Sequence, residues 1–285
     1  MLECVVNVAA GDAGPPLDAL RAACGDALLD RHVDPDHDRT VFTLAGPGDD
    51  DAEAAAQRLA DAAAARLDLT TRPAGAHPRL GILDVVPFVA LGQPAERAVA
   101  AARRAAVHLA DELGVPVFFY GDADRARRTL PELRRDAFVS RGPDRGPARP
   151  HPRLGATAVG ARAPLVAVNC WLDRDDLPLA RAVARAVRAR DGGLPGVRSL
   201  GLRLASRGVA QVSMNVTDLA ATGVEAACEA VRRRVEDGAG AVERVEWVGL
   251  VPEAEWARCS PAFLAWSGLD RSQTVEARLA GAARR

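Results

Sequence analysis

The feature of this sequence best suited to chemistry is a pentapeptide that occurs twice. His77-Pro78-Arg79-Leu80-Gly81 is repeated without change as His151-Pro152-Arg153-Leu154-Gly155, with one copy in each half of the chain and a predicted strand after each. Proline pushes the preceding histidine toward an extended backbone, and glycine permits close approach of another segment. An imidazole presented by such a loop can take up and release protons near neutral pH. The alternative is a structural turn with an incidental histidine.

The remaining histidines are weaker candidates for catalysis. His108 lies within an alanine-rich helical pattern, whereas His32 and His37 belong to an aspartate-rich turn around residues 33–39 (VDPDHDR). The turn lacks the 12-residue pattern of a calcium loop, and no helical HExxH pair occurs in the chain. We therefore expect no metal site. We expect His108 to be a surface or half-buried helix residue, and His32 and His37 to take part in local turn hydrogen bonding rather than to approach a ligand.

Composition excludes several classes of function. The 37 basic residues are all arginine, so a Schiff-base lysine and the lysine of a P-loop are both excluded. They balance 38 acidic residues to a net charge of -1, which does not provide the cationic surface that nucleic acid requires. Five scattered cysteines without a CxxC pair indicate buried free thiols. With no basic leader and no long apolar run, we expect a cytoplasmic protein without a membrane partner.

The hydrophobic pattern predicts the same order of elements in both halves. Strand-like and helix-like runs follow one another as strand, helix, strand, strand, helix, strand. In the first half they are residues 2–8, 15–24, 28–33, 40–45, 50–67 and 83–91, followed by a helix at 94–113 and a strand at 115–120. In the second half they are residues 165–171, 176–190, 198–205, 210–216, 224–235 and 242–250.

This repeated order predicts an α/β (α+β) chain made of two ferredoxin-like βαββαβ subdomains. In such a unit two helices cover one face of an antiparallel sheet. An additional helix and strand extend the first unit.

Two glycine-rich stretches, at residues 155–162 (GATAVGAR) and 192–196 (GGLPG), are left outside the pattern. The first could offer backbone amides to a planar or anionic ligand, with Arg162 supplying charge-assisted hydrogen bonds.

Taken together, these segments resemble the formimidoyltransferase family, the folate-dependent enzymes of histidine degradation. The most specific matches are HPRLGILDVVPF from residue 77 and GATAVGAR from residue 155, and the resemblance runs in order from about residue 2 to 280. It implies an N-terminal subdomain at residues 1–163 and a C-terminal subdomain at residues 164–285, with a ligand groove between them. The implied reaction is transfer of a formimino group from N-formimino-L-glutamate to tetrahydrofolate, the co-substrate.

The resemblance also implies roles for individual residues. His77 corresponds to the catalytic acid and base, and Asp84 would orient it or favour its charged form. The folate-contacting segment corresponds to Gly155, Ala156, Thr157, Ala158, Val159, Gly160, Ala161 and Arg162. Arg39 and Arg79 would bind substrate carboxylates, and Gln211 and Asn215 would face the same groove. The partners implied are small molecules and a second copy of the chain in a homodimer.

The chain also departs from the family pattern. The family opening, close to ECVPNFSEG, reads ECVVNVAAG here, and the family HNR segment reads His37-Asp38-Arg39. A polar contact near the substrate is lost and a neutral amide becomes a charge, while Ala76 replaces the glutamate before His77. Two alternatives therefore stand beside the active transferase. One is a non-catalytic folate-binding paralogue, and the other is a one-carbon transferase with a different donor or acceptor.

Overall fold

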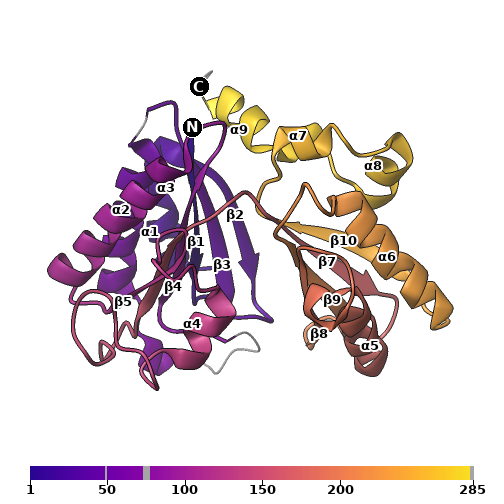
Figure 1. Ribbon diagram of the computed structural model, residues 1–285, viewed down its shortest axis with the longest axis horizontal. Coiled ribbons are helices and arrows are strands. Elements are labelled where there is room, and N and C mark those ends of the chain that lie inside the picture. Colours follow the sequence, from indigo (N-terminus) through magenta and orange to yellow (C-terminus); the bar gives the residue numbers. More distant parts are fainter. Residues whose placement is uncertain (49, 73–77, 283–285) are drawn as a thin grey trace. The chain divides into compact units, whose positions relative to one another are not determined.

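The computed structural model describes residues 1–48, 50–72 and 78–282, and the chain divides into two compact units, Met1–Ala163 and Pro164–Arg285 (Figure 1). Each unit is built on its own β-sheet, with six strands in the first and four in the second.

The described residues of the first unit form six strands and four α-helices. Along the chain they are β1 (Leu2–Val8), α1 (Pro15–Cys24), β2 (Leu28–Asp34), β3 (Arg39–Ala45), α2 (Asp51–Arg66), β4 (Leu83–Ala90), α3 (Ala95–Val107), β5 (Val117–Gly121), α4 (Leu130–Asp136) and β6 (Thr157–Ala161). Helix α3 continues into a π-helical turn, His108–Glu112. The alanine-rich composition of α2 and α3 lets both helices lie close to the sheet.

The sheet of the first unit has the strand order β2-β3-β1-β4-β6-β5. Its first four strands are antiparallel, and β1 lies between β3 and β4. This is the order of a ferredoxin-like βαββαβ unit, so the predicted fold class is confirmed. Strands β6 and β5 extend the sheet beside β4 with parallel pairing. The extension needs α3 as a crossover, because parallel strands cannot be joined by a hairpin.

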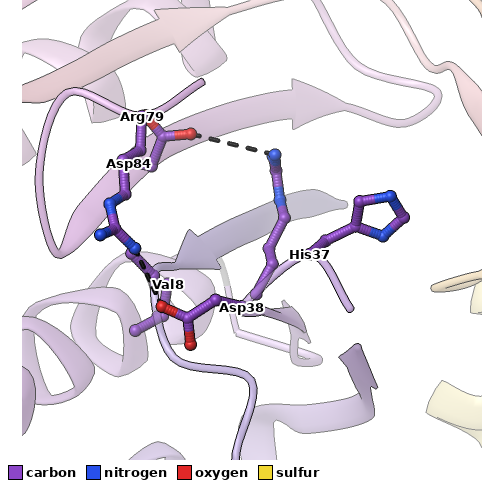
Figure 2. Close-up of a pocket in the computed structure, with 7 residues that line it drawn as sticks. Val8, His37, Asp38, Arg79 and Asp84 are labelled. Carbon is purple, nitrogen blue, oxygen red and sulfur yellow. Dashed lines mark hydrogen bonds and ion pairs between the residues drawn. The ribbon is translucent and has the colours of Figure 1, made fainter. Parts of the chain in front are cut away.

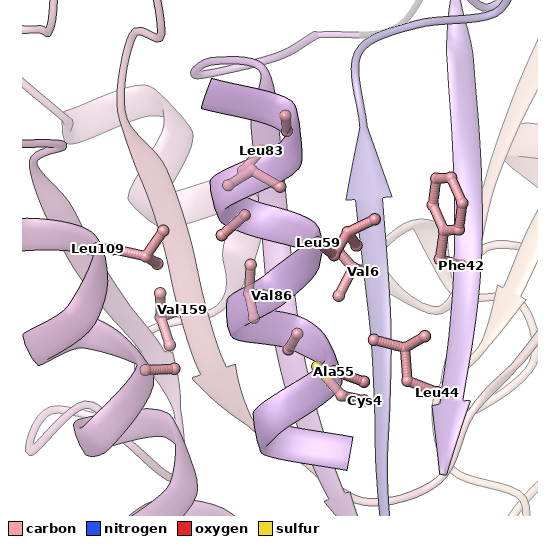
Figure 3. Close-up of a cluster of buried hydrophobic side chains, with 14 of the residues drawn as sticks. Cys4, Val6, Phe42, Leu44, Ala55, Leu59, Leu83, Val86, Leu109 and Val159 are labelled. Atoms are coloured by element: carbon pink, nitrogen blue, oxygen red, sulfur yellow. The ribbon is translucent and has the colours of Figure 1, made fainter. Parts of the chain in front are cut away.

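One face of this sheet forms the main core with α1, α2 and α3 (Figure 1). Figure 3 shows how its side chains meet: Val6 and Phe42 from the sheet face Leu59 of α2, and Val159 faces Leu109. Strand residues alternate between faces, so every second side chain of β1 enters this core. The apolar contacts exclude water from the helix-covered face.

Two elements of the first unit were absent from the sequence prediction. Helix α4 packs its Leu133 against Phe118 and Val85 in a second, smaller apolar cluster on the other face of the sheet. Strand β6 lies in the glycine-rich stretch at residues 155–162, which was left outside the predicted pattern of strands and helices, and all residues of β6 are buried. The stretch is a strand because β4 and β5 supply hydrogen-bonding partners on both sides, which its own composition does not reveal.

The second unit repeats the ferredoxin-like order without an extension. Its elements are β7 (Val166–Leu172), α5 (Leu177–Val187), β8 (Val197–Leu204), β9 (Val209–Val216), α6 (Val224–Asp237) and β10 (Val242–Val248). The antiparallel strands are ordered β10-β7-β9-β8. Helix α5 begins where the Asp176 side chain accepts a hydrogen bond from the amide of Leu179, at 2.9 Å.

Three short helices follow the second sheet: α7 (Glu253–Trp256), α8 (Pro261–Ser267) and α9 (Val275–Ala282). Phe263 of α8 and Val251 join the core of this unit. Among the described residues, we find no helix with the length and apolar character that crossing a membrane would require.

Both copies of the repeated pentapeptide lie in the first unit. The second copy, at residues 151–155, falls in the second half of the sequence but before the boundary at Ala163. There the two copies contact each other: Gly81 and Gly155 form an isolated β-bridge. Both copies thus contribute to the same sheet-bearing unit, although they lie more than 70 residues apart in sequence.

Candidate active site

A small pocket of the first unit brings together several charged side chains (Figure 2). It lies where β1 ends and where β3 and β4 begin. Two small apolar residues and five polar ones line it: Val8, Ala9, His37, Asp38, Arg39, Arg79 and Asp84. The predicted residues Arg39, Arg79 and Asp84 thus lie together.

Strand register explains why residues far apart in sequence meet here. Strand β1 runs antiparallel to both of its neighbours, so Val8 at its end pairs with Thr40 of β3 and with Leu83 of β4. The first residues of β3 and β4 therefore flank the last residues of β1. The amide of Ala9 donates to the carbonyl of Ile82 at 2.8 Å and continues this contact beyond the strands.

Arg39 is held at the first position of β3 by a polar neighbour on β1. Its Nε donates to Oδ1 of Asn7 at 2.8 Å, and its Nη1 lies 3.9 Å from Oδ2 of Asp84. Burial lowers the pKa of Arg39 to about 10, partly offset by the Asp84 carboxylate. Arg39 remains charged at neutral pH, and its guanidinium is poorly hydrated, which strengthens its attraction for an anion.

Asp84 connects three parts of the site. Oδ1 accepts the amide of Leu80 at 2.9 Å, and Oδ2 accepts a hydrogen bond from Arg134 of α4. The carboxylate is almost completely buried, so its charge requires these partners. Asp84 therefore connects the end of the first HPRLG copy to Arg39 and to α4.

Asp38 forms a second charged cluster on the other side of the pocket. Its Oδ2 accepts from Nη1 of Arg79 at 2.9 Å, and Arg72 donates to both oxygens. Its Oδ1 also accepts the amide of Gly11 at 2.8 Å. Burial raises the pKa of Asp38, but the hydrogen bonds from Arg72, Gly11 and Arg79 outweigh it and hold the pKa below its usual value.

The backbone at Gly11 makes this cluster possible. A Cβ at this position would lie 2.4 Å from the carbonyl oxygen of Asp34 and 2.7 Å from the Cα of Asp38. Only glycine lets the chain approach the β2–β3 turn closely enough for its amide to reach the Asp38 carboxylate. Asp38 itself has a positive φ of 47°, which aspartate tolerates better than most residues.

His37 is bound within its own turn. Its amide donates to Oδ1 of Asp34 at 3.0 Å, and its Nδ1 forms a short contact with the other carboxylate oxygen. Burial raises the pKa of Asp34, but the hydrogen bonds from His37 lower it by more. The pKa of Asp34 therefore lies below its usual value. This contact agrees with the expectation that His37 takes part in turn hydrogen bonding. Its ring also borders the pocket.

His77, the predicted proton-transfer residue, lies outside the described residues. Of its pentapeptide, the structure describes Pro78 to Gly81. Its counterpart His151 is described, and there Nδ1 accepts the amides of Arg153 at 3.2 Å and Leu154 at 3.0 Å. These two hydrogen bonds let the imidazole close its own turn. This is the structural-turn alternative that the sequence analysis left open for this motif.

The predicted folate segment, Gly155–Arg162, is placed mostly in the sheet. Its central residues form β6, where parallel ladders on both sides engage the backbone. The amides of Ala156 and Arg162 donate to the carbonyls of Leu80 and Phe88. The backbone amides at these positions therefore form hydrogen bonds within the fold. The assignment of this segment to folate stays a prediction.

Tyr120 lies against the same segment. A Cβ on Gly160 would lie 2.3 Å from the Tyr120 ring, so only glycine at this position of β6 lets the ring pack against the strand. Burial raises the pKa of Tyr120 to about 12, and the Arg162 guanidinium opposes that rise. The phenol is therefore neutral at physiological pH and can act as a hydrogen-bond donor.

Gln211 and Asn215 belong to β9 of the second unit. They alternate with Val212 and Met214, which enter the core beneath the helices. The side chains of Gln211 and Asn215 therefore leave the sheet on the opposite face. Their role toward a substrate stays a prediction.

Three contributors to the pocket region were missed by sequence reasoning: Asn7, Arg72 and Arg134. Arg134 could have been found from the capping signal of its helix, because Thr129 and Glu132 stand three residues apart. Glu132 accepts the Thr129 amide at 2.8 Å. Neither Asn7 nor Arg72 lies in a comparable local pattern, and each becomes recognisable only when its carboxylate or guanidinium partner is known.

The arrangement suits a polar substrate that carries both kinds of charge. Two guanidinium groups and two carboxylates border the pocket, and Val8 and Ala9 form an apolar patch between them. No serine, threonine or cysteine is among the described lining residues, so a covalent nucleophile of those types is not at hand there. Nor do three or more His, Cys, Asp or Glu residues of the described chain cluster in a way that could hold a metal ion.

Comparison with known families matches both units. The family model of the formiminotransferase domain, N-terminal subdomain, matches residues 1–162. The family model of the formiminotransferase domain matches residues 168–270. The two matches thus follow one another along the chain, one in each unit.

Individual relatives extend the match over whole proteins. The glutamate formimidoyltransferase of Thermoplasma acidophilum is 32% identical over 301 residues, covering 99% of this chain and 98% of the relative. That of Streptococcus pyogenes serotype M1 is 33% identical over 268 residues, covering 88% and 89%. The formimidoyltransferase-cyclodeaminase of Sus scrofa is 35% identical over 273 residues, which span 88% of this chain and 50% of the longer relative.

Proposed function

This chain belongs to the formiminotransferase family, and we propose on that basis that it transfers a formimino group from N-formimino-L-glutamate to tetrahydrofolate. The observation that carries the proposal is similarity along nearly the whole chain to proteins named glutamate formimidoyltransferase. The products are 5-formimino-tetrahydrofolate and glutamate.

The reaction exchanges one carbon–nitrogen bond for another. N5 of tetrahydrofolate attacks the amidine carbon of the donor and loses its proton, and a tetrahedral intermediate forms. The bond between that carbon and the glutamate nitrogen then breaks, while the departing nitrogen gains a proton. A single group that takes up the first proton and delivers the second meets both needs, provided that its pKa lies near the working pH.

We assign that proton transfer to His77, on the strength of the HPRLG motif. Asp84 is proposed to support it, because Asp84 accepts the amide of Leu80, three residues beyond His77. The charged form of histidine is favoured by a nearby carboxylate.

Donor binding is proposed to rely on the arginines of the pocket. N-formimino-L-glutamate carries two carboxylates and a planar amidine group. Arg39 and Arg79 both line the pocket, and a guanidinium can bind a carboxylate through two parallel hydrogen bonds. Both side chains are largely buried, with 20% of Arg39 and 17% of Arg79 exposed, so water screens the charge of either guanidinium poorly. Gln211, Asn215 and the segment Gly155–Arg162 are proposed to contact the substrates as the resemblance implies.

The direct test is formation of 5-formimino-tetrahydrofolate from purified protein, tetrahydrofolate and N-formimino-L-glutamate. Product is followed by chromatography and mass spectrometry, with N-formyl-L-glutamate run in parallel as a matched donor that lacks the imino nitrogen. Turnover with the formimino donor supports the proposal. If tetrahydrofolate binds but neither donor reacts, the assigned donor is incorrect.

A second candidate, transfer from a different donor, is favoured by one observation. The pocket is bordered by Val8 and Ala9, and Asp38 places a carboxylate beside Arg79. Both features reduce the affinity of this edge for a dianionic molecule. A donor with fewer carboxylates would then react faster than N-formimino-L-glutamate, which competition between formimino-glycine and the glutamate derivative measures.

The remaining expectations concern the setting of the reaction. We propose that the chain acts as a homodimer in the cytoplasm on small-molecule substrates, with tetrahydrofolate consumed as a co-substrate and no metal required. Sedimentation velocity of the purified protein tests the dimer, and full turnover after treatment with a chelator tests independence from metal.

A further inference from the structure

Asp84 contacts two largely buried arginines in different ways. Its Oδ2 accepts a direct hydrogen bond from Nη2 of Arg134, whereas Nη1 of Arg39 lies 3.9 Å from the same oxygen. The longer separation is not a hydrogen bond. Asp84 and Arg39 both line the pocket (Figure 2), and the described lining residues do not include Arg134. The carboxylate is therefore bonded to the arginine that does not line the pocket.

The Arg134 side chain depends on Asp84 alone for its polar contacts. Among the described residues, Asp84 is the one that accepts a hydrogen bond from it, and the buried Nε of Arg134 donates to none of them. The two side chains are 16% and 5% exposed, so water screens their charges poorly. The pair is held together firmly, because separating it would leave both buried charges uncompensated.

Helix α4 brings Arg134 to this position through contacts that do not involve its guanidinium. Leu133 is fully buried in the smaller apolar cluster of the first unit, and the helix begins at a capping box formed by Thr129 and Glu132. The position of the Arg134 backbone is therefore set by its neighbours in sequence. Removal of the guanidinium leaves these anchors in place, so its effect falls on Asp84.

The three charged groups together carry one excess positive charge, from two guanidinium groups and one carboxylate. Burial lowers the pKa of Arg39 to about 10, Asp84 opposes that change, and Arg134 adds to it. Arg39 therefore remains protonated at neutral pH. Because Asp84 is bonded to Arg134, the excess charge lies on Arg39, at the wall of the pocket.

We infer that Arg134 is a positioning residue, which holds the Asp84 carboxylate away from Arg39 and thereby keeps the charge of Arg39 for a carboxylate of the donor. Without Arg134, Oδ2 of Asp84 loses its direct donor, while Oδ1 keeps the amide of Leu80 at 2.9 Å. The remaining described guanidinium within 4 Å is that of Arg39, about 1 Å beyond hydrogen-bonding distance. The role in donor binding rests on the proposed function, whereas the position of the carboxylate does not.

The test compares two substitutions at Arg134 with one at its neighbour. Arg134→Gln removes the charge, and Arg134→Lys keeps it. Arg135→Gln is the matched control, because it removes the next charge of the same helix from a side chain that is 70% exposed and pairs with Asp136. Thermal unfolding identifies any variant that fails to fold. Arg134→Gln combined with Asp84→Asn leaves no uncompensated charge and keeps the test open if Arg134→Gln alone does not fold.

The first readout is the crystal structure of the parent protein and of each variant, which requires no activity. In Arg134→Gln we expect Nη1 of Arg39 and Oδ2 of Asp84 to approach from 3.9 Å to about 2.8 Å, the length of a charged hydrogen bond. Arg134→Lys and Arg135→Gln should keep the two atoms apart. An unchanged separation in Arg134→Gln would overturn the inference, and so would a direct bond between Arg39 and Asp84 in the parent.

The second readout is the KM for N-formimino-L-glutamate. We expect a rise of roughly 10-fold in Arg134→Gln, because Asp84 then neutralises Arg39, and less than about a twofold change in Arg135→Gln. Adding Asp84→Asn to Arg134→Gln should return KM to within about threefold of the parent value, since a neutral amide cannot neutralise a guanidinium. The readout is KM rather than kcat, because Asp84 is also proposed to support His77.

The recovery of KM separates a positioning role from a structural one. If Arg134 served only the fold, a second substitution in its partner would leave KM raised or raise it further, and that result would refute the inference. If the parent protein shows no turnover while Arg39 and Asp84 approach each other in Arg134→Gln, the positioning role stands and the proposed function fails.

Discussion

The two copies of HPRLG show how identical pentapeptides acquire different roles. Arg79 of the first copy binds Asp38 in the pocket, whereas Arg153 of the second binds Asp68 and the carbonyls of Ala64 and Leu67 at the end of α2. One arginine thus borders a candidate active site and the other secures a helix end. The difference comes from the partners that surround each copy.

The copies also share one feature, the close contact of their glycines. A Cβ on Gly81 would lie 2.2 Å from the carbonyl oxygen of Leu154, and one on Gly155 would lie 2.4 Å from that of Leu80. Each copy therefore requires the glycine of the other. The glycine contact stabilises the fold and is common to both copies. The catalytic role is assigned to the first copy alone.

The largest expected difference between the copies lies at their histidines. His77→Ala should lower kcat by about 10²- to 10⁴-fold, because a general acid and base contributes that much. His151→Ala should leave kcat within about threefold and destabilise the fold by roughly 1–2 kcal/mol, since two amides lose their acceptor. Steady-state kinetics and thermal unfolding of both variants decide the matter. Equal losses of kcat would remove the distinction between the copies.

The glycines provide the next largest effect, on stability. Gly155→Ala combines a steric collision with a positive φ of 73°, and we expect a loss of roughly 3 kcal/mol or more in unfolding free energy. Gly81→Ala introduces the collision alone and should cost somewhat less. Gly92→Ala is the control, with a φ of +62° and nothing within 4 Å, and should cost about 1–2 kcal/mol. Denaturant titration gives the order, and a loss in Gly92→Ala as large as in Gly155→Ala would mean that the contact of the copies is unimportant.

The arginines should give the smallest difference, and they sharpen the comparison by separating binding from stability. Arg79→Ala should raise KM for N-formimino-L-glutamate by roughly 10-fold to 100-fold, the effect of losing a charged hydrogen bond. Arg153→Ala should leave KM unchanged and lower unfolding free energy by about 1 kcal/mol, because its partners lie at the end of α2. Initial-rate measurements over a range of donor concentrations test both. A raised KM in Arg153→Ala would place the second copy at the substrate as well.

Much of the fold could be predicted from the sequence, because a strong hydrophobic periodicity identifies a helix or a strand from its local sequence alone. The repeated βαββαβ order emerged from apolar runs such as residues 83–91 and 210–216. The elements that were missed have weak local signals. Helix α4 is a short one, and β6, with Gly160 and small alanines, becomes a strand only through its two neighbours.

Part of the site was also predictable, through residue type and motif. Arg39, Arg79 and Asp84 were chosen from the sequence, and the structure brings them into one pocket. Their partners were not predictable. Asn7 on β1 accepts a hydrogen bond from Arg39 on the neighbouring strand β3. Arg134 of α4 donates to Asp84, which lies 50 residues earlier in the sequence.

By itself, the sequence determined the class of fold, the family and a short set of candidate residues, since these depend on local pattern and on motifs that survive between relatives. The tertiary structure decided which charges neutralise one another. It placed both HPRLG copies in one unit, set them against each other at Gly81 and Gly155, and directed Arg72 and Arg79 to Asp38. Such pairings depend on strand register and on close backbone approach, and both arise only when segments distant in sequence pack together.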